Sequence, residues 1–192
     1  MKISASDIAA WHYCPRAFYY KKVEKRPAPI TEALVKGTLI HAVYKEYFDR
    51  KLFSNAEYFG WFLNKGIDRI MESEQGRINK IGMNKENLKT FLIETAINLN
   101  KAFANGNISI PTTIEKRIEN NEFVARADAL FEKPGLPLVV ADVKKRLRDL
   151  GGVKLQLAVA AIILGTQGKK VEKGLAIDAE NWKGIEIAID EE

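Results

Sequence analysis

The chain has 192 residues, 46% of them hydrophobic, and carries a formal net charge of +5. This length and composition predict one folded domain with a real core and exclude an intrinsically disordered tail. The modest positive charge permits a polyanionic partner such as DNA without requiring one.

A single cysteine, Cys14, limits the redox and metal chemistry of the chain. With one thiol, neither an internal disulfide nor an intrachain zinc or iron–sulfur site built from several cysteines can form. The N-terminal residues lack an apolar run of the signal-peptide kind, and no stretch reaches the ~18 apolar residues of a membrane span. We therefore expect a reduced, cytoplasmic protein that is not bound to a membrane.

Helices are predicted for the first half of the chain. Ser4 or Ser6, with Asp7, can cap a first helix that runs to about residue 22, and Pro15 interrupts it. Further helical patterns cover residues 31–51, 56–75 and 85–105, with a polar connection at 76–84. Residues 1–106 are thus the mainly helical portion of the chain.

Strands are predicted after Pro111, where the hydrophobic pattern changes. They cover residues 112–119, 122–132, 138–144, 171–178 and 185–189. A helix at 152–165 separates the third strand from the fourth, and it is expected to be buried because it is apolar on nearly every side. Residues 107–192 therefore form a sheet-containing core. The whole chain is predicted to be a single α/β (α+β) domain with a mixed sheet flanked by helices.

Two carboxylates and a lysine are predicted to meet at one end of a hairpin. If its turn is centred on Gly135, Asp128 lies directly opposite Asp142 on the same face, with Cβ atoms roughly 5 Å apart. Lys144 projects from that face two positions later. A carboxylate that ends an apolar run needs a partner. A divalent cation such as Mg²⁺ would be one, and a strand-end salt bridge is the alternative that spacing alone leaves open.

Three further polar residues lie in apolar surroundings. His41 follows Gly37 by one helical turn, and the missing side chain at Gly37 leaves room for a metal ion or a backbone. Gln156 is nearly the only polar side chain in its apolar helix, and Glu115 lies in the middle of a strand. Each has a purely structural alternative: a hydrogen-bonded core histidine, a core glutamine and a solvated strand glutamate.

Several short motifs follow one another in a fixed order along the chain. They are Ile3-Ser4-Ala5-Ser6-Asp7-Ile8 with Tyr13-Cys14-Pro15-Arg16-Ala17-Phe18-Tyr19, then Lys36-Gly37-Thr38-Leu39-Ile40-His41, Arg126-Ala127-Asp128, Val140-Ala141-Asp142-Val143-Lys144 and Leu155-Gln156-Leu157-Ala158. In this order they resemble the CRISPR-associated exonuclease family, the "Cas-four" proteins, which are RecB-like members of the PD-(D/E)xK nuclease superfamily. Each motif alone is weak, whereas the ordered set from about residue 3 to 164 is specific.

The resemblance implies a restriction-endonuclease-like core that hydrolyses phosphodiester bonds of DNA with a bound metal, as an exonuclease and with endonuclease activity left open. It implies that His41, Asp128, Asp142 and the carbonyl group of Val143 bind Mg²⁺ or Mn²⁺. Such a metal lowers the pKa of bound water and stabilises the charge that develops on phosphate oxygens.

The same resemblance assigns the remaining catalytic groups. Lys144 would orient or activate the attacking water and offset charge on the scissile phosphate. Gln156 would help to place this lysine or the DNA backbone, and Glu115 is an additional acidic candidate.

The sequence departs from the family pattern at two points. The family pairs the early cysteine with three near the C-terminus to hold an iron–sulfur cluster, but here Cys14 has no such partners, so an intrachain four-cysteine cluster is excluded. The C-terminal closure would then depend on strand pairing or on dimerisation. Ala160 occupies the position of a tyrosine that usually follows the glutamine, which bears on how the substrate is positioned.

Candidate DNA contacts lie in two segments of the chain. Basic residues that directly follow the acidic motif would bind phosphates without reading sequence; they are Lys145, Arg146 and Arg148. Aromatic residues of the first helix could stack on unpaired bases; they are Tyr13, Phe18, Tyr19 and Tyr20. For at least half of these aromatics we expect core packing instead.

The leading hypothesis is a DNA exonuclease that processes DNA ends in CRISPR spacer acquisition, with single-stranded DNA or single-stranded ends as substrate and CRISPR integrase proteins as partners. One alternative is a RecB-like repair or viral nuclease without a CRISPR role. Another is a non-catalytic DNA-binding module that retains the fold. The intact set of Asp128, Asp142 and Lys144 favours catalysis, whereas Ala160 and the missing cysteines favour binding alone.

Overall fold

The computed structural model of the chain describes residues 2–27, 29–147 and 150–189. The helices are α1 (Ala5–Tyr13), α2 (Pro15–Lys22), α3 (Glu32–Asp49), α4 (Ala56–Trp61), α5 (Ile67–Ser73), α6 (Gln75–Lys80), α7 (Lys85–Ala104) and α8 (Leu150–Thr166). The strands are β1 (Ile3–Ser4), β2 (Thr113–Glu119), β3 (Phe123–Phe131), β4 (Val139–Lys144), β5 (Lys173–Asp178) and β6 (Lys183–Ala188). A 3-10 turn, Leu52–Ser54, precedes α4, and a π-helical turn, Phe62–Gly66, follows it.

Capping residues set the starts of the main helices. The Ser4 hydroxyl accepts a hydrogen bond from the Asp7 amide while the Asp7 carboxylate accepts one from the Ser4 amide, which is a complete capping box for α1. Thr31 caps α3 in the usual way. Pro15 is the first residue of α2, where its missing N–H costs no hydrogen bond. The predicted break of the first helix at Pro15 is confirmed.

The helical portion differs from the predicted pattern between residues 56 and 84. The expected helix 56–75 is divided by the π-helical turn, where the ring of Phe62 lies so close that a Cβ added at Gly66 would be 2.3 Å from it. The expected polar connection 76–84 is wrong at its start, because α6 occupies residues Gln75–Lys80. Ile78 of α6 is fully buried, so tertiary burial stabilises a helical turn that the polar local sequence does not predict.

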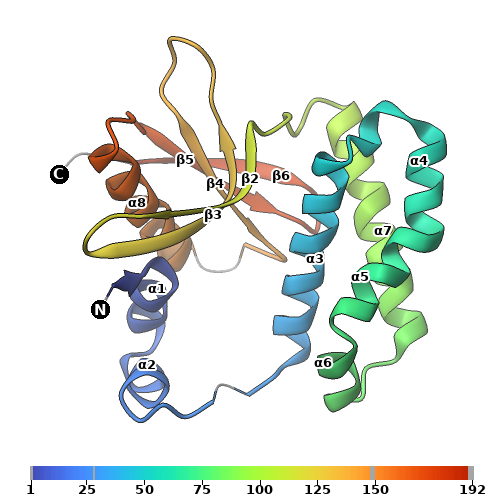
Figure 1. Cartoon of the computed structure of the whole chain (residues 1–192), viewed down its shortest axis with the longest axis horizontal. Helices are drawn as coiled ribbons and strands as arrows, with labels where there is room; N and C mark the ends of the chain where they lie inside the picture. Colours follow the sequence, from blue (N-terminus) through green and yellow to red (C-terminus); the bar gives the residue numbers. More distant parts are fainter. Residues whose placement is uncertain (1, 28, 148–149, 190–192) are drawn as a thin grey trace.

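Six strands form one mixed sheet, in the order β1-β3-β4-β5-β6 with β2 paired to β3 as well (Figure 1). The β2–β3, β3–β4 and β5–β6 pairs are antiparallel, whereas β1–β3 and β4–β5 are parallel. Helix α8 is the crossover that the parallel β4–β5 pair requires. The predicted α/β class with a mixed sheet flanked by helices is confirmed.

The two faces of the sheet are covered by different helices (Figure 1). On one face α3, α5 and α7 enclose a cluster that includes Ala141, Val143 and Trp182. On the other face α1 and α8 enclose a second cluster that includes Val140 and Leu157. Consecutive residues of β4 thus face opposite cores, and the site described below lies where the two meet. None of the helices among the described residues is long and apolar enough to span a membrane.

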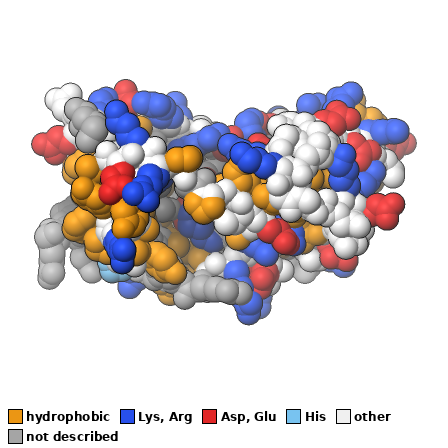
Figure 2. Space-filling model, turned by 90° about the horizontal axis from the view of Figure 1, so that it is seen from below, with side chains coloured by type: hydrophobic (Ala, Val, Ile, Leu, Met, Phe, Trp, Pro, Cys, Tyr) orange, Lys and Arg blue, Asp and Glu red, His pale blue; other side chains and the backbone are white. Residues whose placement is uncertain are grey.

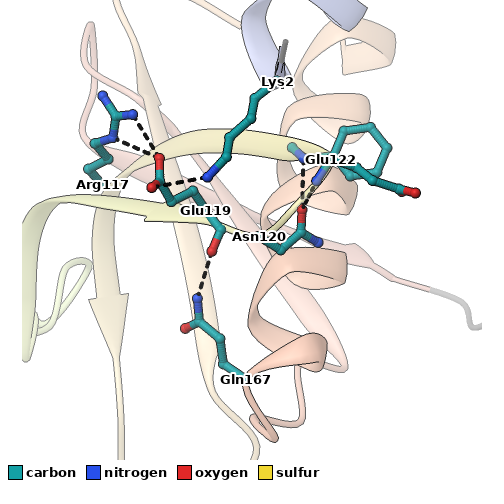
Figure 3. A network of polar contacts seen from close by, with 7 residues as sticks. Lys2, Arg117, Glu119, Asn120, Glu122 and Gln167 are labelled. Atoms are coloured by element: carbon teal, nitrogen blue, oxygen red, sulfur yellow. Dashed lines mark hydrogen bonds and ion pairs between the residues drawn. The ribbon is translucent and has the colours of Figure 1, made fainter.

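The β2–β3 hairpin turns at Asn120 and Asn121, between the predicted strands 112–119 and 122–132. The Asn120 side chain accepts hydrogen bonds from the backbone amides of Glu122 and Phe123, which closes the turn (Figure 3). Gln167, just beyond α8, donates to the carbonyl of Glu119, and Lys2 pairs with the Glu119 carboxylate. These contacts fasten the hairpin to α8 and to the strand β1, a two-residue strand that the sequence does not predict.

Replacing Trp182 by alanine is expected to destabilise the fold by about 3–5 kcal/mol. The indole is fully buried, stacks on Tyr44 with ring centroids 5.7 Å apart and donates to the carbonyl of Thr95. Urea unfolding followed by circular dichroism measures the loss. Trp11→Ala is the matched control, because Trp11 is 55% exposed and should change stability by about 0.5 kcal/mol or less. Equal losses in the two variants would contradict this account of the core.

Candidate active site

One edge of β3 is only partly paired, and the candidate site lies at this gap in the pairing. Along one edge β3 pairs with β2. Along the other it pairs with β1 at Phe123 and Val124 and with β4 from Ala129 to Phe131. Residues 125–128 therefore lie between β1 and β4 without a ladder partner on that edge. Such an interruption leaves backbone and side-chain groups that must find other hydrogen-bond partners.

Asp128 ends this unpaired segment and is held by two donors. Its Oδ2 accepts a hydrogen bond of 2.6 Å from the backbone amide of Val143, and its Oδ1 lies 3.1 Å from Nδ1 of His41. The carboxylate therefore fastens β3 to β4 beyond the end of their ladder and attaches α3 to both. Asp128 is 7% exposed, so both contacts lie in a largely water-excluded environment where hydrogen bonds to charged groups are strong.

The predicted register of the β3–β4 hairpin is confirmed, but the two carboxylates differ in direction. Ala129 pairs with Ala141, which continues to Asp128 opposite Asp142. The face alternation of β3 changes at Asp128, because Ala127 packs with the α8 cluster whereas Ala129 packs with the α3 cluster. Asp128 thus contacts the α3 side, while Asp142 contacts groups on the α8 side.

Asp142, Lys144 and Gln156 form a chain of polar contacts between β4 and α8. Nζ of Lys144 lies 2.9 Å from Oδ1 of Asp142 and 2.9 Å from Oε1 of Gln156, and it donates to both. Lys144 lies two residues after Asp142 on the same strand face, which makes the ion pair geometrically natural. The lysine is thus held in one direction by two acceptors from different elements.

Burial and charge repulsion make the ionised form of Asp142 energetically costly. Burial raises the pKa of the Asp142 carboxyl to about 6; the nearby Lys144 lowers it in part, and the negative charge of Asp128 raises it further. Its Oδ2 is buried and has no hydrogen-bond partner among the described residues. Burying a carboxylate oxygen without a hydrogen-bond partner costs free energy, so this atom is suited to bind a cation.

His41 is electrostatically tied to the same carboxylates. Burial by itself lowers the pKa of His41, but the hydrogen bond and charge of Asp128 outweigh it and raise the pKa above the ordinary value. The imidazole therefore interacts electrostatically with Asp128 and is not an isolated core histidine.

The predicted metal ligands do not form a ready-made metal site. Among the residues that the structure describes, no group of three His, Cys, Asp or Glu side chains could hold a metal ion as it stands. The reason lies in the contacts above: Asp128 is occupied by His41 and the Val143 amide, and Asp142 by Lys144. The donor set nevertheless fits Mg²⁺ or Mn²⁺, because it offers carboxylate oxygens, an imidazole and the free Oδ2 of Asp142.

A cavity of about 480 Å³ opens beside Asp142. It lies between the start of α1, the unpaired segment of β3 and α8. Its polar lining consists of Ser4, Ser6, Glu115, Arg117, Arg126, Asp142 and Gln156. Ala160 also lines it, so the small side chain at this position contributes to the open space. Two guanidinium groups beside a buried carboxylate give the cavity both signs of charge.

Glu115 lines this cavity and is held in an unusual backbone conformation. Its φ is 49°, in the left-handed region that a non-glycine residue rarely adopts. The β2–β3 ladder is regular on both sides but lacks the pair of Glu115 with Asp128. The Glu115 carboxylate accepts a hydrogen bond of 2.7 Å from Arg126. The predicted solvated strand glutamate is thus a backbone-strained, ion-paired residue at the site.

The predicted DNA-contacting residues lie next to the site but have different surroundings. Nζ of Lys145 lies 5.8 Å from the ring centre of Phe91 in α7, and Arg146 pairs with Glu180 at 3.3 Å. Arg148 lies outside the described residues. Lys145 and Arg146 follow Lys144 directly at the end of β4.

Sequence reasoning missed Tyr44 and the two arginines of the cavity. Tyr44 is 1% exposed, and its hydroxyl has no hydrogen-bond partner among the described residues. Burial raises the pKa of this hydroxyl far above its usual range, and the charge of Asp128 acts in the same direction. The signal in the sequence was its position three residues after His41, on the same helical face.

Comparison with known proteins gives one informative match. The family model described as the PD-(D/E)XK nuclease superfamily matches residues 2–186 of the chain. No curated protein matches it. Among solved structures, one titled "Crystal structure of SSO0001" aligns with 93% of this chain and 77% of its own, at 15% identity and a TM-score of 0.28. A likeness this weak carries no structural argument.

Asp142→Asn is expected to stabilise the metal-free protein above about pH 6. The folded-state pKa of Asp142 is raised from 3.8 to about 6, so its contribution to stability is present below pH 3.8 and is lost as the pH rises through 6. At pH 7.5 the asparagine variant should be more stable by roughly 1–3 kcal/mol. Urea unfolding with chelator at pH 4 and at pH 7.5 measures this. A stability difference that does not grow with pH would contradict the proposed cost of burying the carboxylate.

Proposed function

We propose that this chain, which belongs to the PD-(D/E)XK nuclease superfamily, hydrolyses phosphodiester bonds of DNA with the help of a divalent cation. Nucleases of this superfamily generally use divalent metals. The observation that carries the proposal is the buried Asp142, whose Oδ1 holds Lys144 while its Oδ2 has no partner among the described residues. A carboxylate and an ammonium group kept together at a cavity are the parts that metal-assisted hydrolysis requires.

His41, Asp128 and Asp142 are the side chains that would hold the cation, together with the carbonyl group of Val143. When bound, the cation would lower the pKa of a water molecule and stabilise charge on the phosphate oxygens. Asp128 also fixes the backbone of Val143 through the amide hydrogen bond of 2.6 Å. In an extended strand the N–H and C=O groups of one residue point to the same edge, so this contact also fixes the direction of the Val143 carbonyl group.

Lys144 is the proposed positioning group for the attacking water and the scissile phosphate. Gln156 holds the ammonium group at 2.9 Å without neutralising its charge, because an amide carbonyl is uncharged. With two of its three N–H groups donated to Asp142 and Gln156, the ammonium has one N–H left to donate to the attacking water or to a phosphate oxygen. Arg117 and Arg126 lie at the same cavity and would add positive charge where the DNA backbone enters.

The finer proposal is that the chain processes DNA ends in CRISPR spacer acquisition, with CRISPR integrase proteins as partners. It rests on the resemblance of the ordered motifs, of which the Gly37-to-His41 element and the Asp142-to-Lys144 element contribute side chains to this site. A gene that lies beside those of the integrase would support it. A gene among DNA-repair or viral genes would instead favour the RecB-like alternative.

Single-stranded DNA labelled at one end should be degraded in Mg²⁺ or Mn²⁺ and left intact with chelator. Lys144→Ala and Asp142→Ala are each expected to reduce the rate by roughly 100-fold or more, because each removes a group that acts on the transition state. Lys80→Ala is the matched control, since Lys80 is an exposed lysine of α6. Binding of DNA without cleavage of single-stranded, duplex and flapped substrates in either metal would favour a non-catalytic binding module.

Metal binding can be separated from chemistry by thermal unfolding in increasing Mn²⁺. At a concentration 100 times its Kd, the cation should raise the free energy of unfolding by about 2.7 kcal/mol. Asp128→Asn is expected to lose most of this stabilisation, whereas Lys144→Ala should keep it because the lysine is not a ligand. A Mn²⁺ effect that is equally lost in both variants, or kept in both, would contradict the proposed ligand set.

A further inference from the structure

We propose that the exposed aromatic and basic side chains of α1 and α2 form a docking surface for single-stranded DNA, beside the proposed active site. This inference rests on the proposed nuclease function, because it names the surface that would hold the substrate strand of this function. The aromatic face is defined as Trp11, Tyr13, Phe18, Tyr19 and Tyr20.

The aromatic face is not part of a core, which makes the expected core packing of its residues wrong. Trp11, Tyr13 and Tyr19 are 55%, 80% and 48% exposed, and Phe18 and Tyr20 are half-buried. Helix α2 contains no buried residue. Large exposed rings gathered at the end of α1 and on α2 are a marked exception to the usual composition of a protein surface.

Neighbouring rings and guanidinium groups hold this face in a defined geometry. Trp11 and Phe18 meet edge to face, with ring centroids 5.6 Å apart. The Tyr20 ring has the guanidinium carbon of Arg16 at 5.6 Å and that of Arg26 at 4.8 Å from its centre. Rings that are already ordered lose little conformational entropy when a base stacks on them.

The charge around these rings is strongly positive. Five basic side chains and one acidic side chain, Glu24, lie between residues 13 and 26. Among the described residues, Lys21 and Lys25 have no ion-pair partner, whereas Lys22 pairs with Asp7 and Arg26 with Glu24. Figure 2 shows the result on the underside of the molecule, where hydrophobic and basic side chains are interleaved over α2 at the left.

This combination fits an unpaired strand better than a duplex or a protein. Single strands are bound by aromatic rings that stack on bases together with a basic surface that follows the phosphates. A duplex hides the faces of its bases, so the rings would gain nothing from it. A protein partner would need hydrophobic contact, and such a contact would have to desolvate the basic side chains Lys21 and Lys25 that follow the rings.

The aromatic face lies close enough to the cavity to act on the same strand. Ser4 and Ser6, at the start of α1, line the cavity beside Asp142, and Tyr13 ends the same helix. A nine-residue helix is about 13 Å long, so Trp11 and Tyr13 lie only a few nucleotides from the cavity. A strand held on these rings would present its neighbouring phosphates to the cavity.

The test is binding of a fluorescent 20-nucleotide oligo(dT) in chelator, so that no cleavage occurs. The double variant Trp11→Ala/Tyr13→Ala is expected to weaken binding at least fivefold for the single strand and less than twofold for a duplex. Lys21→Ala/Lys25→Ala should weaken binding and reduce the salt dependence of the affinity. The matched controls are Tyr58→Ala, whose ring is 64% exposed on α4, and Lys80→Ala/Lys85→Ala; both should bind as the wild type does.

Trp11 supplies a second and direct readout. In a Trp61→Phe background the remaining indoles are Trp11 and the fully buried Trp182. Stacking of a base on Trp11 should therefore quench the fluorescence of this exposed indole, and Trp11→Phe should abolish the quenching. Quenching that persists in Trp11→Phe would place the bases elsewhere.

The outcomes separate this inference from the nuclease proposal. If the wild type cleaves DNA but the aromatic variant binds oligo(dT) normally, the docking surface is wrong and the nuclease stands. If nothing is cleaved but binding depends on Trp11 and Tyr13, the docking surface stands alone. Loss of self-association in the aromatic variant, with unchanged affinity for oligo(dT), would overturn the inference in favour of a contact between two copies of the chain.

Discussion

The hydrogen bond from the Val143 amide to Asp128 is the contact on which the site depends. The β3–β4 ladder ends at the pair Ala129 and Ala141, so without this contact the two strands would separate just where the carboxylates lie. Because the acceptor is a charged side chain, the sheet is continued by a group that also faces α3 through His41. One buried carboxylate therefore joins the strands, positions the helix and concentrates negative charge beside Asp142. The cost of that charge is consistent with a site that is completed by a cation.

The site takes its side chains from both helical layers that cover the sheet. Helix α3 brings His41 from the bundle on one face of the sheet, whereas α8 brings Gln156 from the other. The groups of the site meet only because β4 has consecutive residues that face opposite cores. Substitutions that shift either layer should therefore change the relation between the histidine and the lysine without touching any polar group. Packing density makes such shifts costly, which keeps the site rigid.

Much of this could be predicted from the sequence because its signals are local. The turn at Gly135 fixed the register that places Asp128 opposite Asp142, and strand periodicity brought Lys144 to the face of Asp142. The ordered motifs predicted the superfamily. What could not be predicted depends on long-range contacts: the strand β1 exists only because β3 offers it an edge, and α6 exists because Ile78 is buried. The turn of Asp128 towards α3 and the strained backbone of Glu115 likewise result from tertiary packing, which periodicity does not encode.

Cys14 shows how the N-terminal helices keep their shape. Its sulfur accepts a hydrogen bond from the Ala17 amide at 3.4 Å and so begins α2, a task in which serine or aspartate oxygens are the stronger acceptors. The thiol is therefore replaceable at this position by side chains that have no redox chemistry. Because Pro15 and this cap begin α2 through local contacts alone, the start of the helix does not require a bond between the sulfur and a metal. The orientation of the two helices relative to the sheet is set by the packing of α1 on α8 and on β3, and by the short β1 strand.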